Sequence, residues 1–209
     1  MKPIDQFLSS LSRPRNSGIL KNPYRKPELL QNLRIYLEAM LLVEGARVLL
    51  VGEALGFKGG KLTGIPFSSG AIYQRFQHPL LQQIAPQLDI ETIESENTAT
   101  IVWEYLSRTG RTPLFWNAFP FHPHPRGERN KNRAPTVAEV KKGVGYLQCL
   151  AELYQPNVIA GVGGKGTACA RAAFPEHEVV AIRHPSYGGK SEFIAGVERL
   201  YKGLGQSVS

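Results

Sequence analysis

Three polar side chains that could do chemistry follow short apolar runs at well-separated points of the chain. Glu53 follows "RVLLVG" and opens a glycine-rich loop, Asn117 ends an apolar stretch in "PLFWNAF", and His184 follows "EVVAIR". A carboxylate can stabilise a cation or activate water, a carboxamide offers a hydrogen-bond donor and acceptor in one plane, and an imidazole can donate to developing negative charge. If the apolar runs are parallel strands, their carboxyl ends bring these groups to one crevice.

The elements that must position them alternate between strand and helix patterns. Short branched apolar runs predict buried strands, and three- or four-residue apolar spacing predicts helices. Capping signals support two of the helices: Ser95 with Gly110 at its two ends, and Thr136 with Glu139 in a capping box. The predicted strands span 47–52, 113–119, 157–162 and 178–183, and the predicted helices span 27–43, about 95–110, 137–154, 167–173 and 191–202. This order predicts a three-layer α/β/α domain around a four-stranded, mainly parallel sheet.

Length and composition indicate one soluble domain. A chain of 209 residues that is 42% hydrophobic can bury one sizeable core, so we expect a single domain over 1–209, with 1–26 as a helical or extended N-terminal segment. No apolar run is long enough to span a bilayer and no signal peptide is recognisable, so we expect no membrane association and a cytoplasmic protein. Cys149 and Cys169 lie on predicted helices without paired spacing, and we expect both to be buried thiols.

The charge indicates a polyanionic partner. The formal net charge is +8, and basic residues cluster in "PRGERNKNR", 125–133, and in "RPRNSGILKNPYRK" near the start. Lysine and arginine in excess attract phosphates, although a solvated basic surface explains each cluster equally well when it is taken alone.

The chemical motifs resemble those of the uracil-DNA glycosylase superfamily. "GEALG", "TGIPF", "WNAF" and "HPS" occur in its order and approximate spacing over about residues 47–200, and the Gly-Glu-Ala opening is closest to family 4. The resemblance implies a monofunctional enzyme that hydrolyses the N-glycosidic bond of uracil, or a related deaminated base, in DNA. The resemblance also implies a role in base excision repair. We expect a monomer that acts on single-stranded or mismatched uracil-containing DNA, because Tyr187 and the two glycines after it are a poor wedge for opening an intact duplex.

The resemblance implies a role for each motif residue. Asn117 would read the O4 and N3–H edge of uracil, Phe67 would stack on the extruded base, and Gly52 and Ala54 would line the base pocket. His184 would stabilise the departing base, while Glu53 would stabilise the sugar cation and activate water. Each also has a structural alternative: a turn asparagine, a core phenylalanine, a buried histidine, or a glutamate bonded to loop amides.

Some positions depart from the family 4 pattern. Leu55 replaces its usual proline, and two dispersed cysteines cannot hold its iron–sulfur cluster, so we expect no cofactor. His122 and His124 lack a third ligand, so we expect no metal site. Tyr187, followed by Gly188, stands where relatives carry a leucine wedge, and it is the bulky residue available to replace the lost base stack.

The predicted DNA-binding residues lie in residues 125–133, which we call the basic loop, and around the ends of two predicted strands. "GVGGKGT", 161–167, lacks the Walker sequence because Gly166 interrupts it. Its expected use is a helix start near a DNA phosphate, with a simple tight turn as the alternative. A non-catalytic module binding single-stranded nucleic acid or a nucleotide, and a hydrolase for another base or nucleoside, remain alternatives. The predicted DNA contacts are Arg126, Arg129, Lys131, Arg133, Lys165, Ser186, Tyr187 and Gly188.

Overall fold

The computed structural model describes residues 2–206, so residue 1 and residues 207–209 of the expected domain lie outside the described residues. The strands of the main sheet are β2 (Val48–Ala54), β3 (Leu114–Phe119), β5 (Val158–Val162) and β6 (Val179–Ile182). The longer helices are α1 (Pro3–Ser12), α2 (Pro27–Leu41), α6 (Asn97–Thr109), α7 (Val137–Tyr154), α8 (Gly163–Ala173) and α9 (Lys190–Gln206). The short elements are β1 (Leu20–Lys21), η1 (Pro23–Arg25), α3 (Gly60–Thr63), α4 (Ile72–Arg75), α5 (Pro79–Ile84), η2 (Ala85–Gln87) and β4 (His122–Pro123).

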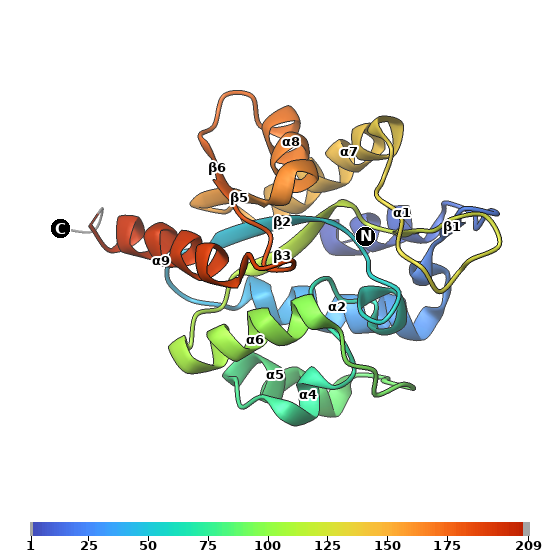
Figure 1. Cartoon of the computed structure of the whole chain (residues 1–209), viewed down its shortest axis with the longest axis horizontal. Helices are drawn as coiled ribbons and strands as arrows, with labels where there is room; N and C mark the ends of the chain where they lie inside the picture. Colours follow the sequence, from blue (N-terminus) through green and yellow to red (C-terminus); the bar gives the residue numbers. More distant parts are fainter. Residues whose placement is uncertain (1, 207–209) are drawn as a thin grey trace.

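The central sheet has the order β3-β2-β5-β6, and each neighbouring pair is parallel. Helices α7 and α8 cover one face, while α2 and α6 lie on the other (Figure 1). Both faces are therefore buried, which explains why β2 and β3 are apolar without alternation. The predicted three-layer α/β fold with four strands is confirmed, and the sheet is wholly parallel rather than mainly so.

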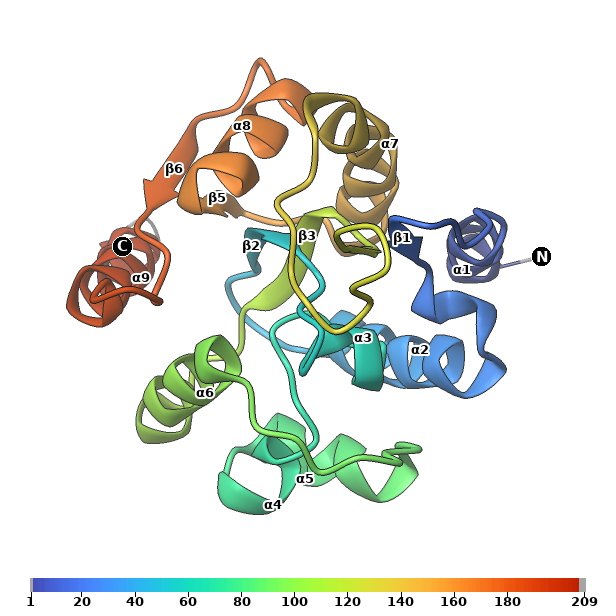
Figure 2. The same cartoon turned by 45° about the vertical axis from the view of Figure 1, so that its right-hand side comes forward.

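The N-terminal segment contains α1, β1 and η1. Helix α1 packs beside the sheet, with the ring of Phe7 5.5 Å from that of Trp116 on β3. Strand β1 pairs with β4 in a separate antiparallel sheet, which lies with α1 at one side of the molecule (Figure 2). Buried apolar residues from α1 to α9 form one continuous core cluster, so this segment is built into the fold.

Two predicted helix starts need correction. Glu96, not Ser95, caps α6, because its carboxylate accepts from both the Thr98 and Ala99 N–H groups, at 3.0 and 2.7 Å. Helix α8 begins at Gly163, four residues before the predicted start. Glycine lowers helix propensity, but α8 packs so closely on β2 that a Cβ at Gly166 would lie 1.9 Å from the Val51 carbonyl oxygen.

The prediction of two buried thiols is half wrong. Cys169 is buried on α8, whereas Cys149 is exposed on α7. The buried side of α7 is formed by Gly143, Leu147, Leu150 and Tyr154, at the spacing of one helix face, and Cys149 lies off that face. The capping box of this helix is present as predicted, with Thr136 and Glu139 bonded reciprocally.

Candidate active site

The carboxyl ends of β2 and β3 place Gly52 and Asn117 side by side as register partners. Asn117 is only 3% exposed, and its carboxamide makes no hydrogen bond with the described part of the chain. A buried carboxamide normally finds partners, because leaving one unsatisfied costs about 1–3 kcal/mol. The donor and acceptor of Asn117, which bond no protein group, are therefore available to water or a ligand.

A tight turn over residues 63–70 carries Phe67 to the same place. The hydroxyl of Ser68 donates to the Ile65 carbonyl at 2.8 Å, and the indole N–H of Trp103 donates to the Phe67 carbonyl at 2.9 Å. These bonds hold Phe67 in the left-handed region, at φ 53°. Its ring is half-buried between buried neighbours and stacks on Phe115 with a centroid distance of 4.7 Å.

The Phe67 ring and the Asn117 carboxamide both lie against Gly52. A Cβ added at Gly52 would lie 2.4 Å from the Phe67 ring and 2.8 Å from the Asn117 Oδ1 atom. Only glycine permits this approach without displacing one of them. An aromatic ring and a coplanar donor–acceptor pair next to bare backbone form a suitable binding site for a planar heterocycle.

Glu53 follows directly at the strand end and is half-buried. Its carboxylate forms no hydrogen bond or ion pair with residues 2–206. Burial raises its pKa, and the charge of Lys165, in the first turn of α8, opposes that shift. The structural alternative, in which Glu53 bonds loop amides, is therefore wrong, and the carboxylate is free to meet water or a developing cation.

His184 lies two residues beyond β6, with its backbone enclosed by glycines. A Cβ at Gly189 would lie 2.1 Å from the His184 carbonyl oxygen, and one at Gly163 would lie 3.4 Å from the His184 Cβ. The Ser186 N–H donates to His184 Nδ1 at 3.2 Å, so the proton of the neutral ring is on Nε2. Burial lowers its pKa, Glu96 opposes this, and Arg183 lowers it further. At neutral pH the ring is thus an uncharged donor.

Residues of α6 and α9 that the sequence analysis did not select hold this loop in place. The hydroxyls of Thr98 and Ser186 are hydrogen-bonded at 3.0 Å, and Thr98 is in the first turn of α6, which Glu96 caps. Lys190, at the start of α9, forms an ion pair with Glu104 of α6 at 2.7 Å. Helix α6 thereby fixes both ends of the His184 loop. Glutamate is an unusual cap, so no strong sequence signal marks it.

Comparison with known proteins identifies the family of the chain. The family model described as "Uracil DNA glycosylase superfamily" matches residues 41–195, which include Glu53, Phe67, Asn117 and His184. The chain belongs to the uracil-DNA glycosylase superfamily. Among solved structures, it is similar to wild-type SMUG2 of Pedobacter heparinus, with 15% sequence identity, 99% of each chain covered and a TM-score of 0.68. That likeness supports the superfamily fold, and no curated protein matches the sequence.

Tyr187 projects from the loop that carries the last superfamily motif. It is 96% exposed and has φ 53°, and Gly188 after it has φ 80°. A left-handed conformation costs an L-residue about 1–2 kcal/mol, so a large exposed aromatic residue is held there at the expense of stability. Such an observed outlier is a reason to look for function.

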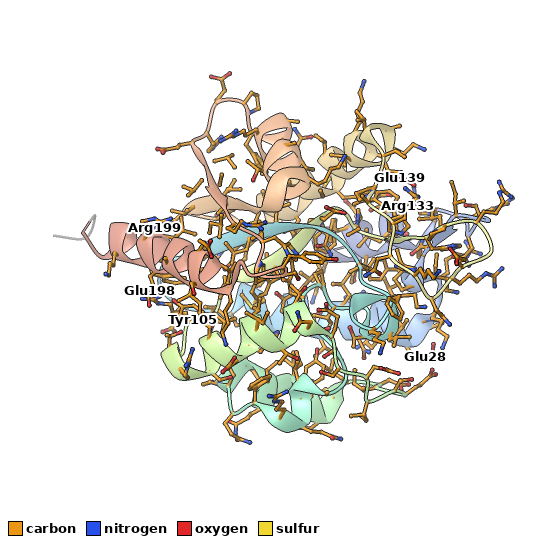
Figure 3. All side chains as sticks on the ribbon, in the orientation of Figure 1. Glu28, Tyr105, Arg133, Glu139, Glu198 and Arg199 are labelled. Atoms are coloured by element: carbon orange, nitrogen blue, oxygen red, sulfur yellow. The ribbon has the colours of Figure 1, made fainter. Side chains whose placement is uncertain are left out.

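The basic loop lies beside the loop that follows Glu53, and its members differ in what they contact. Arg126 and Arg129 are exposed without an ion pair in the described chain, and Lys131 pairs with Glu128 at 2.6 Å. Arg133 instead donates to both carboxylate oxygens of Glu139, at 2.9 and 2.8 Å, and the two side chains meet in Figure 3. The guanidinium of Arg133 is thus already engaged in fixing the loop to α7.

The paired histidines serve the architecture of this superfamily member. His122 Nδ1 lies 2.8 Å from the Leu55 carbonyl oxygen and its Nε2 lies 3.2 Å from that of Arg129. His124 stacks on it and contacts the Pro125 carbonyl. Within residues 2–206, no group of histidine, cysteine, aspartate or glutamate side chains could hold a metal ion. In the same range, no helix is both long and apolar enough to cross a membrane.

Proposed function

We propose that the protein is a monofunctional DNA glycosylase that releases uracil, or a related deaminated base, and leaves an abasic site. The observation that carries this proposal is the convergence of Phe67 and Asn117 on Gly52, with the unpaired carboxylate of Glu53 as the next residue. Membership of the uracil-DNA glycosylase superfamily supports the reaction class. The single-domain, monomeric protein expected from the sequence is part of the proposal.

Base recognition would use the groups that the fold leaves unsatisfied. Asn117 would donate to uracil O4 and accept from N3–H, whereas cytosine presents the reverse pattern at that edge. Phe67 would stack on the extruded base, a contact worth about 1–3 kcal/mol that does not depend on sequence. Ala54, the last residue of β2, would line the pocket beside them.

Bond cleavage would divide the developing charges between two residues. The C1′–N1 bond breaks with its electron pair going to the base, and the Nε2–H of His184 stabilises the resulting anion at O2. Glu53 stabilises the oxocarbenium-like sugar, and it takes a proton from the water whose oxygen bonds to C1′. The free base then takes a proton from solvent, and no lysine nucleophile is required.

Single-stranded or mismatched DNA would be the preferred partner. Flipping a base from an intact duplex costs a few kcal/mol of pairing and stacking, and Tyr187 beside Gly188 is the bulky group available to compensate. Arg126, Arg129 and Lys165 would contact phosphates, which fixes orientation without reading sequence. Ser186 would help hold the strand beside His184.

The test is uracil release from oligonucleotides containing one uracil, in single strands, in mismatches and opposite adenine, with alkali-labile breaks as the readout. We expect release to decrease in that order. Asn117→Asp replaces the donor to O4 with a carboxylate that repels it, so release should fall by roughly 10⁴-fold. If no abasic product forms on any substrate while single strands still bind tightly, the non-catalytic binding module replaces this proposal.

A further inference from the structure

A second basic segment lies outside the matched part of the chain and has no role in the proposed reaction. Between residues 13 and 26 there are five basic residues and no acidic one. The superfamily match begins only at residue 41. The structural question is where these charges lie relative to the active site.

The fold places this segment directly against the basic loop. Strand β1 pairs with β4, which puts Lys21 beside His122, and the His124 N–H donates to the Ile19 carbonyl at 3.0 Å. The guanidinium of Arg126 lies 3.1 Å from the Cβ position of Gly18. In both ribbon views, the loop over 125–133 runs next to the N-terminal segment (Figures 1 and 2). The two clusters, about a hundred residues apart in sequence, are neighbours in space.

The basic loop is in turn joined to the loop that follows Glu53. Lys61 Nζ donates to the Arg129 carbonyl at 3.1 Å and to Asn130 Oδ1 at 3.0 Å. The Phe57 N–H donates to Asn132 Oδ1 at 2.9 Å. Basic side chains therefore continue from the mouth of the candidate active site, across residues 125–131, to the segment over 13–21.

These charges are gathered with few carboxylates to neutralise them. Arg13, Arg15, Arg126 and Arg129 are exposed and form no ion pair within the described chain, and neither does Lys21. Lys21 lies near Lys61, whose pKa is lowered by burial and by that neighbouring charge. Like charges held together destabilise the fold unless a polyanion binds them, and binding releases the counterions of that polyanion.

We propose that residues 13–21 and the basic loop form one continuous track for the sugar–phosphate backbone of the DNA strand on one side of the target nucleotide. The inference rests on the proposed DNA-binding function. It adds that the protein contacts a longer stretch of the strand on one side of the target nucleotide than on the other. Because the track leaves the active site on one side, extending the strand in one direction only should increase affinity.

The experiment measures affinity by fluorescence anisotropy, using single strands that carry one 2′-fluoro-2′-deoxyuridine, whose fluorine slows cleavage by destabilising the sugar cation. The shortest probe has roughly eight nucleotides, and longer probes extend it only on the 5′ side or only on the 3′ side. The track variant carries Arg13→Gln, Arg15→Gln and Lys21→Gln. The matched control removes three exposed charges elsewhere, with Arg108→Gln, Arg199→Gln and Lys202→Gln; Arg199 lies at the far end of the molecule from Arg133 in Figure 3.

Wild-type protein and the control should gain affinity with extension on one side, and the track variant should lose that gain. Its salt dependence on the long probe should flatten by about 2 in slope, since each phosphate contact to a single strand contributes about 0.7. Equal gains on both sides, no gain, or an unaffected track variant would overturn the inference. Uracil release from the shortest unmodified probe is measured separately, so loss of the proposed enzyme activity and loss of the track are distinguishable.

Discussion

Replacing Gly52 with alanine tests whether the contact between Phe67 and Asn117 is the base-binding site. The new Cβ would lie 2.4 Å from the Phe67 ring, and an ordinary carbon–carbon contact needs about 3.5 Å, so the ring must retreat by about 1 Å. Overpacking of this kind costs about 1–3 kcal/mol of stability. If the retreat removes the stacking of the base, worth about 1–3 kcal/mol, uracil release should fall by roughly tenfold to a hundredfold.

The matched control is Gly56→Ala, four residues further along the chain, in the loop that follows β2. A Cβ there has Glu96 Cγ as its nearest neighbour at 3.9 Å, an ordinary contact, so release should be close to wild type. Single-turnover release from a uracil-containing single strand is the assay, with thermal unfolding measured for both variants. Wild-type rates for Gly52→Ala, or an equal loss for both variants, would refute the assignment of this contact to the base.

Two further predictions concern residues whose environment is unfavourable for folding. Glu53→Gln should lower single-turnover release by roughly 10²-fold or more. Because burial raises the pKa of Glu53, its ionised form destabilises the fold above that pKa; the variant should therefore melt higher than wild type at pH 7, and the difference should vanish below about pH 4. An unchanged rate would remove Glu53 from catalysis. Tyr187→Ala should reduce uracil release from duplexes by roughly tenfold, and should reduce release from single strands less. Tyr187→Phe should keep the activity on duplexes. Equal effects of Tyr187→Ala on both substrates would exclude a role for Tyr187 as a wedge.

The sequence predicted the sheet and the place where its chemistry gathers, because both follow from local patterns. Four branched apolar runs mark the strands, and the carboxyl ends of parallel strands necessarily share an edge. The exact positions of the loops that carry the candidate site residues depend on contacts between residues far apart in the sequence. The hydrogen bond between the hydroxyls of Thr98 and Ser186 joins residues almost ninety positions apart, and no spacing rule relates them. For the same reason, the neighbouring positions of the two basic clusters could not be predicted.

Backbone conformations and unpaired polar groups that are unfavourable for stability lie mainly at the carboxyl end of the sheet, around the candidate active site. Within residues 2–206, the non-glycine residues with positive φ are Phe67, Gln155 and Tyr187. Gln155 ends a helix, where this conformation is common, whereas Phe67 and Tyr187 lie in the two loops that flank the candidate active site. A chain under selection for stability alone would use glycine at both positions, and it would pair the half-buried carboxylate of Glu53 and the buried carboxamide of Asn117. Local rules are broken where a side chain is needed in a fixed place, which is the pattern expected of an active site and not of a structural surface.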